Sequence, residues 1–494
     1  LGADISVINS NPAGIGLFRR SSGSVSFGLV SQDGASSFKY GNKTNASFDQ
    51  AGFVYSMRDG RRTFINFGFN YHKSKNFDYI LNAASGLNGA SQHKLSYMKA
   101  LANENNLDKT SSGWRGKFAY TSQLDNLYYN TLMMTSSDGF FYNDASRYEF
   151  GRAETGYIGE YNFNTSANVN DRVYLGVTIG IHDVHYTGHS LYNEALVNLN
   201  NQTAGDITVN DERRITGTGY NASFGIIFRP VDASPFRIGL SVTTPTLYDL
   251  KTSNYTYLIN NTKADGGGKL QGDYPNYTTG ESYEFKLFTP WKYGVSLGHT
   301  VGNYLALGAS YEYADYSRLD TRVNDGYDVD YWGDVYEHSS SDEPMNRHTR
   351  ETLKAVSTLK IGAEAKVMPN LAVRAGYNYV SPMFKKEGYK DGNIDSYGSN
   401  YSSATDYTNW EATNRYTVGV GYTLGKMSFD LAYQYAQTNG KFHPFADSYL
   451  DYTYPGQDSN GNDVTMTESL DNYANAVNVS NKRNQLLLTL TYRF

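Results

Sequence analysis

The stretch "RYTVGVGYTL", residues 415–424, alternates between two kinds of side chain with a period of two. One set is apolar or aromatic and the other is small or polar: Tyr416, Val418, Val420, Tyr422 and Leu424 against Thr417, Gly419, Gly421 and Thr423. A strand that separates lipid from a wet lumen needs these two faces. A soluble β-sandwich shows a similar alternation, so the period alone leaves both folds open.

The spacing of such stretches decides between the two folds. Alternation of this kind predicts strands near 23–32, 47–58, 62–73, 154–168, 172–186, 215–229, 236–245, 284–298, 304–315, 352–366, 371–381, 415–424, 427–437 and 484–494. The linkers after the even-numbered strands are tiny, such as "DGR" and "GK", whereas those after odd-numbered strands are much longer. Segregated short and long connections and an even strand count are typical of outer-membrane barrels. The sequence therefore predicts an all-β, antiparallel transmembrane barrel of about fourteen strands.

This reading also predicts the domain organisation. We expect residues 1–22 to precede the barrel and residues 23–494 to form it, with both termini on the periplasmic side. The expected extracellular loops are 74–153, 187–214, 246–283, 316–351, 382–414 and 438–483. Within the first of them, the central part of residues 82–107 has helical spacing and few β-branched residues, so a short helix is predicted there.

The composition supports a barrel and excludes other classes. The chain has 45 Tyr, 24 Phe and 48 Gly among 494 residues, no Cys and a mean hydropathy of −0.56. Tyr and Phe favour strands, and Tyr also favours membrane–water interfaces. A net charge of −6 without a basic patch argues against nucleic-acid partners. The nine His residues do not fall at metal-ligand spacings, so neither a metal nor a cofactor is expected. A barrel must be exported, so we expect Leu1 to lie in a processed or trimmed protein.

Three stretches carry a resemblance to a known family. "NSNPAGIG" (residues 9–16) looks like the family's N-terminal Asn-Pro-Ala-Gly motif. "LKIGAEAKVMPNLAVRAGYNYVSPMF" (359–384) and "RYTVGVGYTLGKMSFDLAYQYA" (415–436) resemble its late strand pairs, and "TPWKYGVSLG" (289–298) its mid-barrel segment. On these residues the chain resembles the FadL-type outer-membrane transporters of long-chain fatty acids and other hydrophobic molecules.

The resemblance implies an N-terminal plug, called the hatch, inside the barrel. It also implies capture of substrate at the outer mouth and lateral exit through a gap in the wall. The residues expected to form this gate are Asn9, Asn11, Pro12, Ala13 and Gly14. Their chemistry fits the role, because proline rigidifies the segment, glycine lets it turn, and asparagine bonds to exposed backbone.

Charged residues on the late strands form the second candidate site. Lys360, Glu364, Arg374 and Asp430 fall on the inward register. Charges cannot face lipid at mid-depth without a penalty of about 2–4 kcal/mol, which nearly forces this direction. They could simply pair with one another beside water. Alternatively, Lys360 or Arg374 could meet an anionic head group or contact the hatch, and the sequence does not separate these possibilities.

Two functions remain open, and neither is an enzyme. The first is a passive channel for hydrophobic or amphipathic small molecules in the outer membrane of a Gram-negative bacterium, in contact with its lipid and lipopolysaccharide. The alternative is a FadL-like barrel that serves as an accessory subunit of a larger outer-membrane assembly for secretion or barrel insertion. The long Tyr-rich loops favour it, because tyrosine suits protein recognition. The only catalytic motif, "GVSLG" at 294–298, lies inside a strand and lacks the strand–turn–helix context of a nucleophile elbow.

Overall fold

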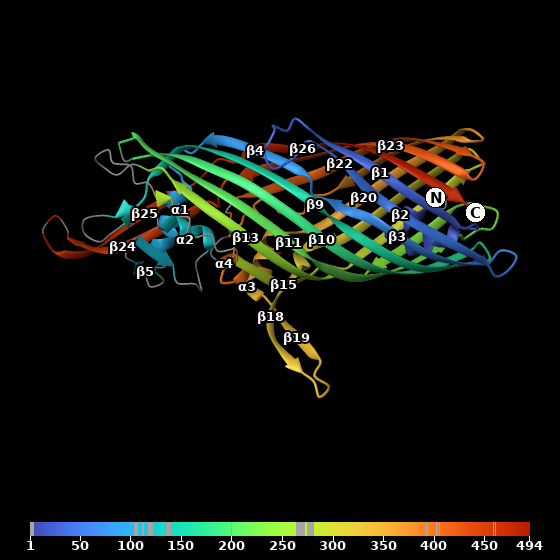
Figure 1. Cartoon of the computed structure of the whole chain (residues 1–494), viewed down its shortest axis with the longest axis horizontal. Helices are drawn as coiled ribbons and strands as arrows, with labels where there is room; N and C mark the ends of the chain where they lie inside the picture. The colour runs from blue at the N-terminus through green and yellow to red at the C-terminus, as the bar shows by residue number, and fades with distance from the viewer. Residues whose placement is uncertain are drawn as a thin grey trace.

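The chain folds into an all-β barrel that closes on itself (Figure 1). The computed structural model describes the chain except for residues 1–3, 103–106, 111–112, 117–121, 130, 132, 135–139, 199, 263–271, 274–280, 392–393, 402–403, 405, 458 and 460. In the described part, fourteen antiparallel strands form the ring, and the last of them pairs with the first from Ser22↔Arg493 to Asp33↔Lys482. Closure leaves no unpaired strand edge facing lipid. The predicted fold class and strand number are confirmed.

The wall strands follow one another in chain order, each paired with the next. They are β1 (Ser22–Asp33), β2 (Thr44–Arg58), β3 (Phe64–Asn76), β9 (Asp144–Val169), β10 (Val173–Val197), β11 (Thr203–Phe228), β12 (Arg237–Thr243), β16 (Lys292–Val301), β17 (Leu305–Asp315), β20 (Ala355–Met368), β21 (Leu371–Val380), β22 (Tyr407–Leu424), β23 (Met427–His443) and β26 (Val477–Arg493). Both termini lie at the same end of the barrel, as expected (Figure 1).

An apolar band covers the outside of the ring. Leu175, Val177 and Ile179 point outward from β10, and equivalent residues point outward from the other strands. Tyrosines stand in register at the rim of this band, such as Tyr377 of β21 opposite Tyr416 of β22. Aromatic side chains at this position are typical of membrane–water interfaces.

Several strands run farther than their apolar alternation predicts. The sequence predicts a loop over 187–214, but β10 and β11 continue through it and pair from His189↔Glu212 to Val197↔Thr203. The prediction was wrong because it required an apolar face. Beyond Ile181 the outward positions of β10 become Asp183 and His185, which are polar because this part of the wall stands clear of lipid. For the same reason, parts of the expected loops 74–153, 382–414 and 438–483 are strand.

Three wall strands are interrupted halfway along. β12 ends before Pro245 and the chain resumes as β13 (Leu247–Asn260); β15 (Glu281–Phe288) is separated from β16 by Pro290. Proline cannot donate to the sheet ladder, which explains both breaks. After β17, a turn of 3₁₀ helix (η5, Tyr316–Arg318) leads to β18 (Asp320–Val329), which forms a hairpin with β19 (Val335–Ser341). The loops expected over 246–283 and 316–351 therefore contain strands, and the second also contains α3 (Glu343–Thr352).

The remaining elements lie mostly at the end of the barrel away from the termini (Figure 1). They are β4 (Tyr79–Gly86), α1 (Gln92–Ala102), β5 (Leu107–Thr110), β6 (Gly113–Gly116), α2 (Gln123–Tyr129), β7 (Met133–Met134), β8 (Phe140–Phe141), β14 (Gly272–Asp273), α4 (Tyr397–Asn400), β24 (Ser448–Gln457) and β25 (Asp463–Asn472). The helix predicted within 82–107 is confirmed by α1. Among the described residues, no helix is both long and apolar enough to cross a membrane.

The N-terminal segment lies inside the barrel as a plug. It consists of two 3₁₀ helices, η1 (Ile5–Asn9) and η2 (Pro12–Leu17). Ile8, Ala13 and Ile15 are fully buried, which is unusual for residues so near a chain end. The plug predicted from the family resemblance is confirmed, and its apolar residues pack on the inner wall.

Candidate functional site

Asparagines of the wall hold the plug in place. Asn66 of β3 is fully buried, and its Nδ2 donates to the carbonyls of Ile15 (2.8 Å) and Phe18 (3.1 Å). On β9, Asn164 donates to the carbonyl of Pro12 (3.3 Å), and Asn162 donates to the side chain of Asn9 (2.9 Å). These bonds join buried polar groups of the plug to the wall. The plug is therefore fixed to the wall by side chains rather than by a sheet ladder.

Asn11 is the plug residue that reaches the wall on the other side. Its Oδ1 caps η2 by accepting from Ala13 N–H (3.0 Å), while its Nδ2 donates to the carbonyl of Leu240 on β12 (3.1 Å). The wall must lack side chains where its backbone comes this close to the plug. A Cβ on Gly225 of β11 would lie 2.1 Å from Asn11 Oδ1, and one on Gly176 of β10 would lie 2.4 Å from the carbonyl carbon of Pro12. Glycine allows this close approach.

A buried cluster of ionisable groups contacts the plug at Asn9. The Nδ2 of Asn9 lies 2.9 Å from Nε2 of His72, whose Nε2 is 3.5 Å from Glu160. The other carboxylate oxygen of Glu160 is 3.4 Å from Nδ1 of His182. His182 in turn lies 2.9 Å from Nδ2 of Asn221. The plug and four wall strands, β3, β9, β10 and β11, thus share one polar network.

The plug fills only one side of the lumen. Inward side chains on β3 and β9 beneath it are buried, as Asn66 and Asn164 show. On the opposite wall, the inward residues Lys360 and Gly362 are exposed, and 42% of the Arg374 side chain is accessible. We call the space along the inner face of β17, β20, β21, β22 and β26 the lane. The inward residues Lys360, Gly362 and Arg374 show that this side of the lumen is accessible to solvent.

The structure divides the four predicted lumen charges into two sets. Nε of Arg374 lies 2.6 Å from Glu364, and its Nη1 is bonded to Asp430. These three form an ion-paired triad. Lys360 is not part of it; it occupies a separate level of the wall and pairs across the sheet with Asn378.

Lys360 belongs to a row of cations that the sequence did not reveal. The register runs Lys360↔Asn378↔Arg415 across β20, β21 and β22, and Arg415↔Ala436↔Arg483 across β22, β23 and β26. Neighbouring strands are about 4.8 Å apart, so successive cations lie about 10 Å apart along the row. We call Lys360, Arg415 and Arg483 the basic row.

The environment of the basic row leaves it positive. Arg483 donates to the carbonyl and side-chain oxygens of Asn76 (3.1 and 2.8 Å). Lys75 of β3 also lies near Arg415 and Arg483, and the carboxylates close to this group are Glu154 and Asp78. Cations therefore outnumber carboxylates here.

Between the basic row and the triad, the lane has no inward side chains on four adjacent strands. Gly298, Gly308, Gly362 and Gly376 stand in one cross-strand row over β16, β17, β20 and β21. We call these four residues the glycine row. At this level the wall consists only of its backbone and its outward side chains.

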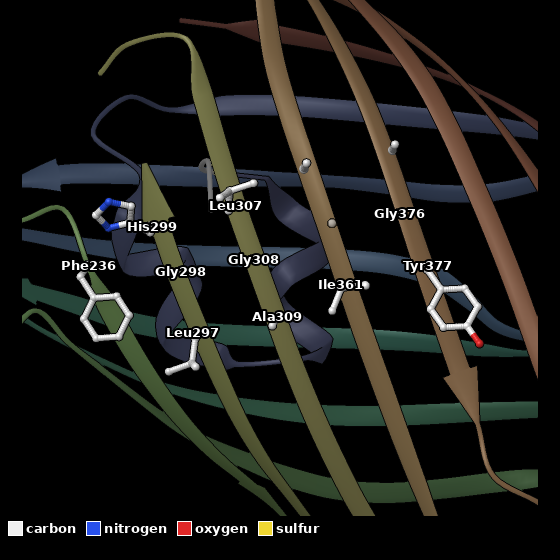
Figure 2. A pocket seen from close by; sticks show the side chains of 13 residues that line it. Phe236, Leu297, Gly298, His299, Leu307, Gly308, Ala309, Ile361, Gly376 and Tyr377 are labelled. Carbon is white, nitrogen blue, oxygen red and sulfur yellow. The ribbon is translucent and has the colours of Figure 1, made fainter. Parts of the chain in front are cut away.

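An apolar groove of about 620 Å³ lies on the outside of the wall at the glycine row (Figure 2). Small residues form its floor, including Ala309, and larger ones flank it, including Leu297, Ile361 and Tyr377. Leu297 and Ile361 are 46% and 49% exposed. The inward glycine row and the outward groove thus make the wall thin at this level.

A packed cap closes the barrel end opposite the termini. Leu95 and Met98 of α1 and Leu124 and Tyr128 of α2 are buried there; the core includes Phe442 and Phe445. A cavity of about 20 Å³ remains under the cap, which is room for about one water. The described residues of α1 and α2 thus pack against the wall at this end of the barrel.

Glu194 is a carboxyl buried within this cap. It lies near the end of β10, well beyond Ile181, where the lipid-facing band ends. Its Oε2 accepts from Gln92 N–H at the start of α1 (2.9 Å) and from the hydroxyl of Tyr192 (3.1 Å). Burial raises the pKa of Glu194 to about 7, and these hydrogen bonds only partly oppose that rise. The contact that holds α1 thus involves a group that titrates near neutral pH.

Comparisons with known proteins give a structural likeness only. No family model matches the sequence, and no curated protein matches it. Among solved structures, the chain is similar to a Pseudomonas aeruginosa FadL homologue, with 13% identity over 100% of this chain and 95% of that one, at a TM-score of 0.48. It is also similar to the Ralstonia pickettii toluene transporter TbuX (14% identity, 99% and 94% covered, TM-score 0.46) and the CymD monoaromatic hydrocarbon channel (10%, 100% and 95%, 0.45). The first of these bears the name of the family that the sequence resembles.

Sequence reasoning missed the asparagines and two of the three residues of the basic row. A signal for the first exists, because Asn162, Asn164 and Asn168 recur at even spacing where small inward residues are expected. Arg415 and Arg483 lie at the edges of the predicted strands, where the face assignment is least secure. Their convergence depends on cross-strand register, which local periodicity does not give.

Proposed function

We propose that this chain is a passive outer-membrane channel for hydrophobic or amphipathic small molecules. The observation that carries the proposal is the lane beside the plug. It starts under an apolar cap, passes the basic row, and reaches the glycine row and the triad. Along this route, an amphipathic molecule meets apolar surface for its tail and positive charge for its anionic head group.

Burial of the apolar part supplies the driving force for capture. Each methylene group removed from water contributes about 0.8 kcal/mol, so an apolar mouth concentrates a fatty-acid-like chain without an energy source. The cap residues around Tyr128 offer such a surface once α1 and α2 move apart. The basic row then binds the head group, because a carboxylate surrounded by a barrel wall of low dielectric is stabilised by the cations that bond to it.

Release toward lipid occurs at the glycine row in this proposal. The groove outside it gives an apolar tail a place to go in the membrane. The strands β16, β17, β20 and β21 are continuously paired at this level, so exit requires them to part. The plug gates the alternative route at the barrel end, with Asn9, Asn11, Pro12, Ala13 and Gly14 as its docking residues.

Binding of a fluorescent long-chain fatty acid to the purified full chain tests the proposal. Arg483→Gln removes one charge of the basic row, and we expect the dissociation constant to rise at least about tenfold, since charge-assisted bonds contribute about 1.5–3 kcal/mol. Lys482→Gln is the matched control, because it removes the same charge from the neighbouring, outward position. Equal affinities for the wild type and both variants, or no saturable binding at all, would refute the proposed head-group site.

A further inference from the structure

The hairpin formed by β18 and β19 leaves the barrel wall and has no role in the lane. β18 pairs with β15 from Phe288↔Asp320 to Phe285↔Val323, and beyond that point it pairs with β19. Figure 1 shows the hairpin standing out from the side of the barrel, across the barrel's long axis. The wall is already complete below it, where β17 pairs with β20. The hairpin is therefore an addition to the barrel and not a part of its closure.

The base of the hairpin is firmly held. The guanidinium of Arg322 on β18 bonds to Asp320 (3.0 Å), to the hydroxyls of Ser339 and Ser341 (3.0 Å each) and to the carbonyl of Ser339. It also lies 5.3 Å from the centre of the Phe288 ring on β15. These contacts join both hairpin strands to the wall, so the hairpin has a defined direction.

The tip is organised around one carboxylate. Oδ1 of Asp330 accepts from the N–H groups of Trp332 (2.8 Å) and Asp334 (2.9 Å), and Oδ2 accepts from the hydroxyl of Tyr336 (3.2 Å). The turn presents Tyr331 and Trp332 to solvent, 94% and 83% exposed, with ring centres 5.5 Å apart. Large aromatic groups are normally removed from water, and a fixed, exposed pair of this kind is typical of a recognition site.

The negative charge of the hairpin limits which kinds of molecule can bind to it. Residues 323–340 contain no Lys or Arg and five carboxylates: Asp325, Asp328, Asp330, Asp334 and Glu337. The hairpin begins just past Tyr311 and Tyr313, which belong to the outward tyrosine rim of β17. It therefore extends sideways at the height of the lipid head groups. An anionic lipid surface repels five carboxylates, and a second copy of this chain carries net charge of the same sign, −6.

We propose that the β18–β19 hairpin docks on a neighbouring protein in the same membrane, on a surface rich in lysine and arginine with an apolar pocket for Tyr331 and Trp332. Electrostatic attraction steers the partner to the hairpin, and the aromatic pair supplies the central contact. The proposal is independent of transport, because no residue of the lane takes part in it.

Site-specific photo-crosslinking in the native bacterium tests this docking. Tyr331 is replaced by the photoreactive residue p-benzoyl-phenylalanine in the full chain, and adducts are identified by mass spectrometry after irradiation. We expect one discrete adduct with a second protein, joined at a peptide that lies on a lysine- and arginine-rich surface. The same photoreactive residue at Tyr449, exposed on the β24–β25 hairpin, should not give this adduct.

Two variants separate docking from mere proximity. Asp325→Asn with Asp334→Asn removes two charges and leaves the side chain of Asp330, which organises the turn, in place; it should lower the adduct yield at least about fivefold. Trp332→Ala should lower it at least about tenfold, the effect of a central aromatic contact. Heat-modifiable migration on gels verifies that each variant is a folded barrel.

Several outcomes would overturn the proposal. They are adducts with lipopolysaccharide, adducts with a second copy of this chain, and the absence of any protein adduct from a folded, normally abundant chain. A protein adduct whose yield is unchanged in both variants would also overturn it, since that result shows random collision and not recognition.

Discussion

Replacing Asn66 by alanine should release the plug without unfolding the barrel. Asn66 donates two hydrogen bonds to plug carbonyls, those of Ile15 and Phe18. Each carbonyl keeps another donor, namely Phe18 N–H (3.1 Å) for Ile15 and the Ser56 hydroxyl (3.2 Å) for Phe18. The loss is therefore that of two ordinary bonds, about 0.5–1.5 kcal/mol each, or about 1–3 kcal/mol together. The undocked population should rise between about fivefold and about 150-fold.

Thiol labelling measures this population directly. The chain contains no cysteine, so Ile8→Cys, at a fully buried plug position, gives a unique reporter. A water-soluble maleimide reaches it only when the plug leaves the wall. If docking and undocking are fast relative to labelling, the rate is proportional to the open population. We expect Asn66→Ala to speed labelling by the factor given above.

The control is an asparagine of similar chemistry on the far wall. Asn378 of β21 faces the lane on the row of Lys360, away from the plug. Asn378→Ala should leave the labelling rate unchanged. An unchanged rate in Asn66→Ala, or equal acceleration in both variants, would refute the view that the buried asparagine holds the plug.

Two further changes probe the plug contact and the cap. Gly225→Ala should accelerate labelling as well, because its Cβ would lie 2.1 Å from Asn11 Oδ1 and displace Asn11 from the N-terminus of η2. Gly362→Ala should not accelerate labelling, because its Cβ would meet nothing nearer than 3.5 Å. Burial raises the pKa of Glu194 from 4.5 to about 7, so deprotonation favours the opened cap, and stability is lost as the pH rises from about 4.5 to about 7. Relative to Glu194→Gln, the wild-type cap should lose up to about 3 kcal/mol over this range, measured by hydrogen exchange of α1, and identical pH profiles would contradict the assignment.

Much of the fold could be predicted because barrel strands show their two environments in the sequence. Lipid on one side and lumen on the other impose a strict alternation, as in residues 415–424, and this gave the strand number. The strand ends could not be predicted in the same way. Once β10 rises beyond Ile181, water lies on its outer face, and the apolar signal stops although the hydrogen-bonded ladder continues to Val197.

The site was predictable only where it depended on a single strand. The plug residues from Asn9 to Gly14 carry their own signal, a rigid and small-residue turn with no strand to join. The asparagines that receive them lie far away in the chain, and only cross-strand register shows that Asn66 and Asn164 face the same plug.

The same limit explains why the four predicted lumen charges separate into two sites. Their inward direction followed from the expense of placing charge in lipid, and this holds for each strand alone. The level at which each charge lies along the barrel axis cannot be derived from one strand alone, because strand tilt and cross-strand register determine it. Arg374 meets Glu364 and Asp430, so its charge is already matched and little attraction for a ligand remains. Lys360 instead joins Arg415 and Arg483, which repel one another and are balanced by fewer carboxylates. A wall position with surplus positive charge lowers its energy by binding an anion, whereas a triad of one cation and two carboxylates, which is net negative, does not. In the proposed channel, the basic row rather than Arg374 is therefore the position that meets an anionic head group.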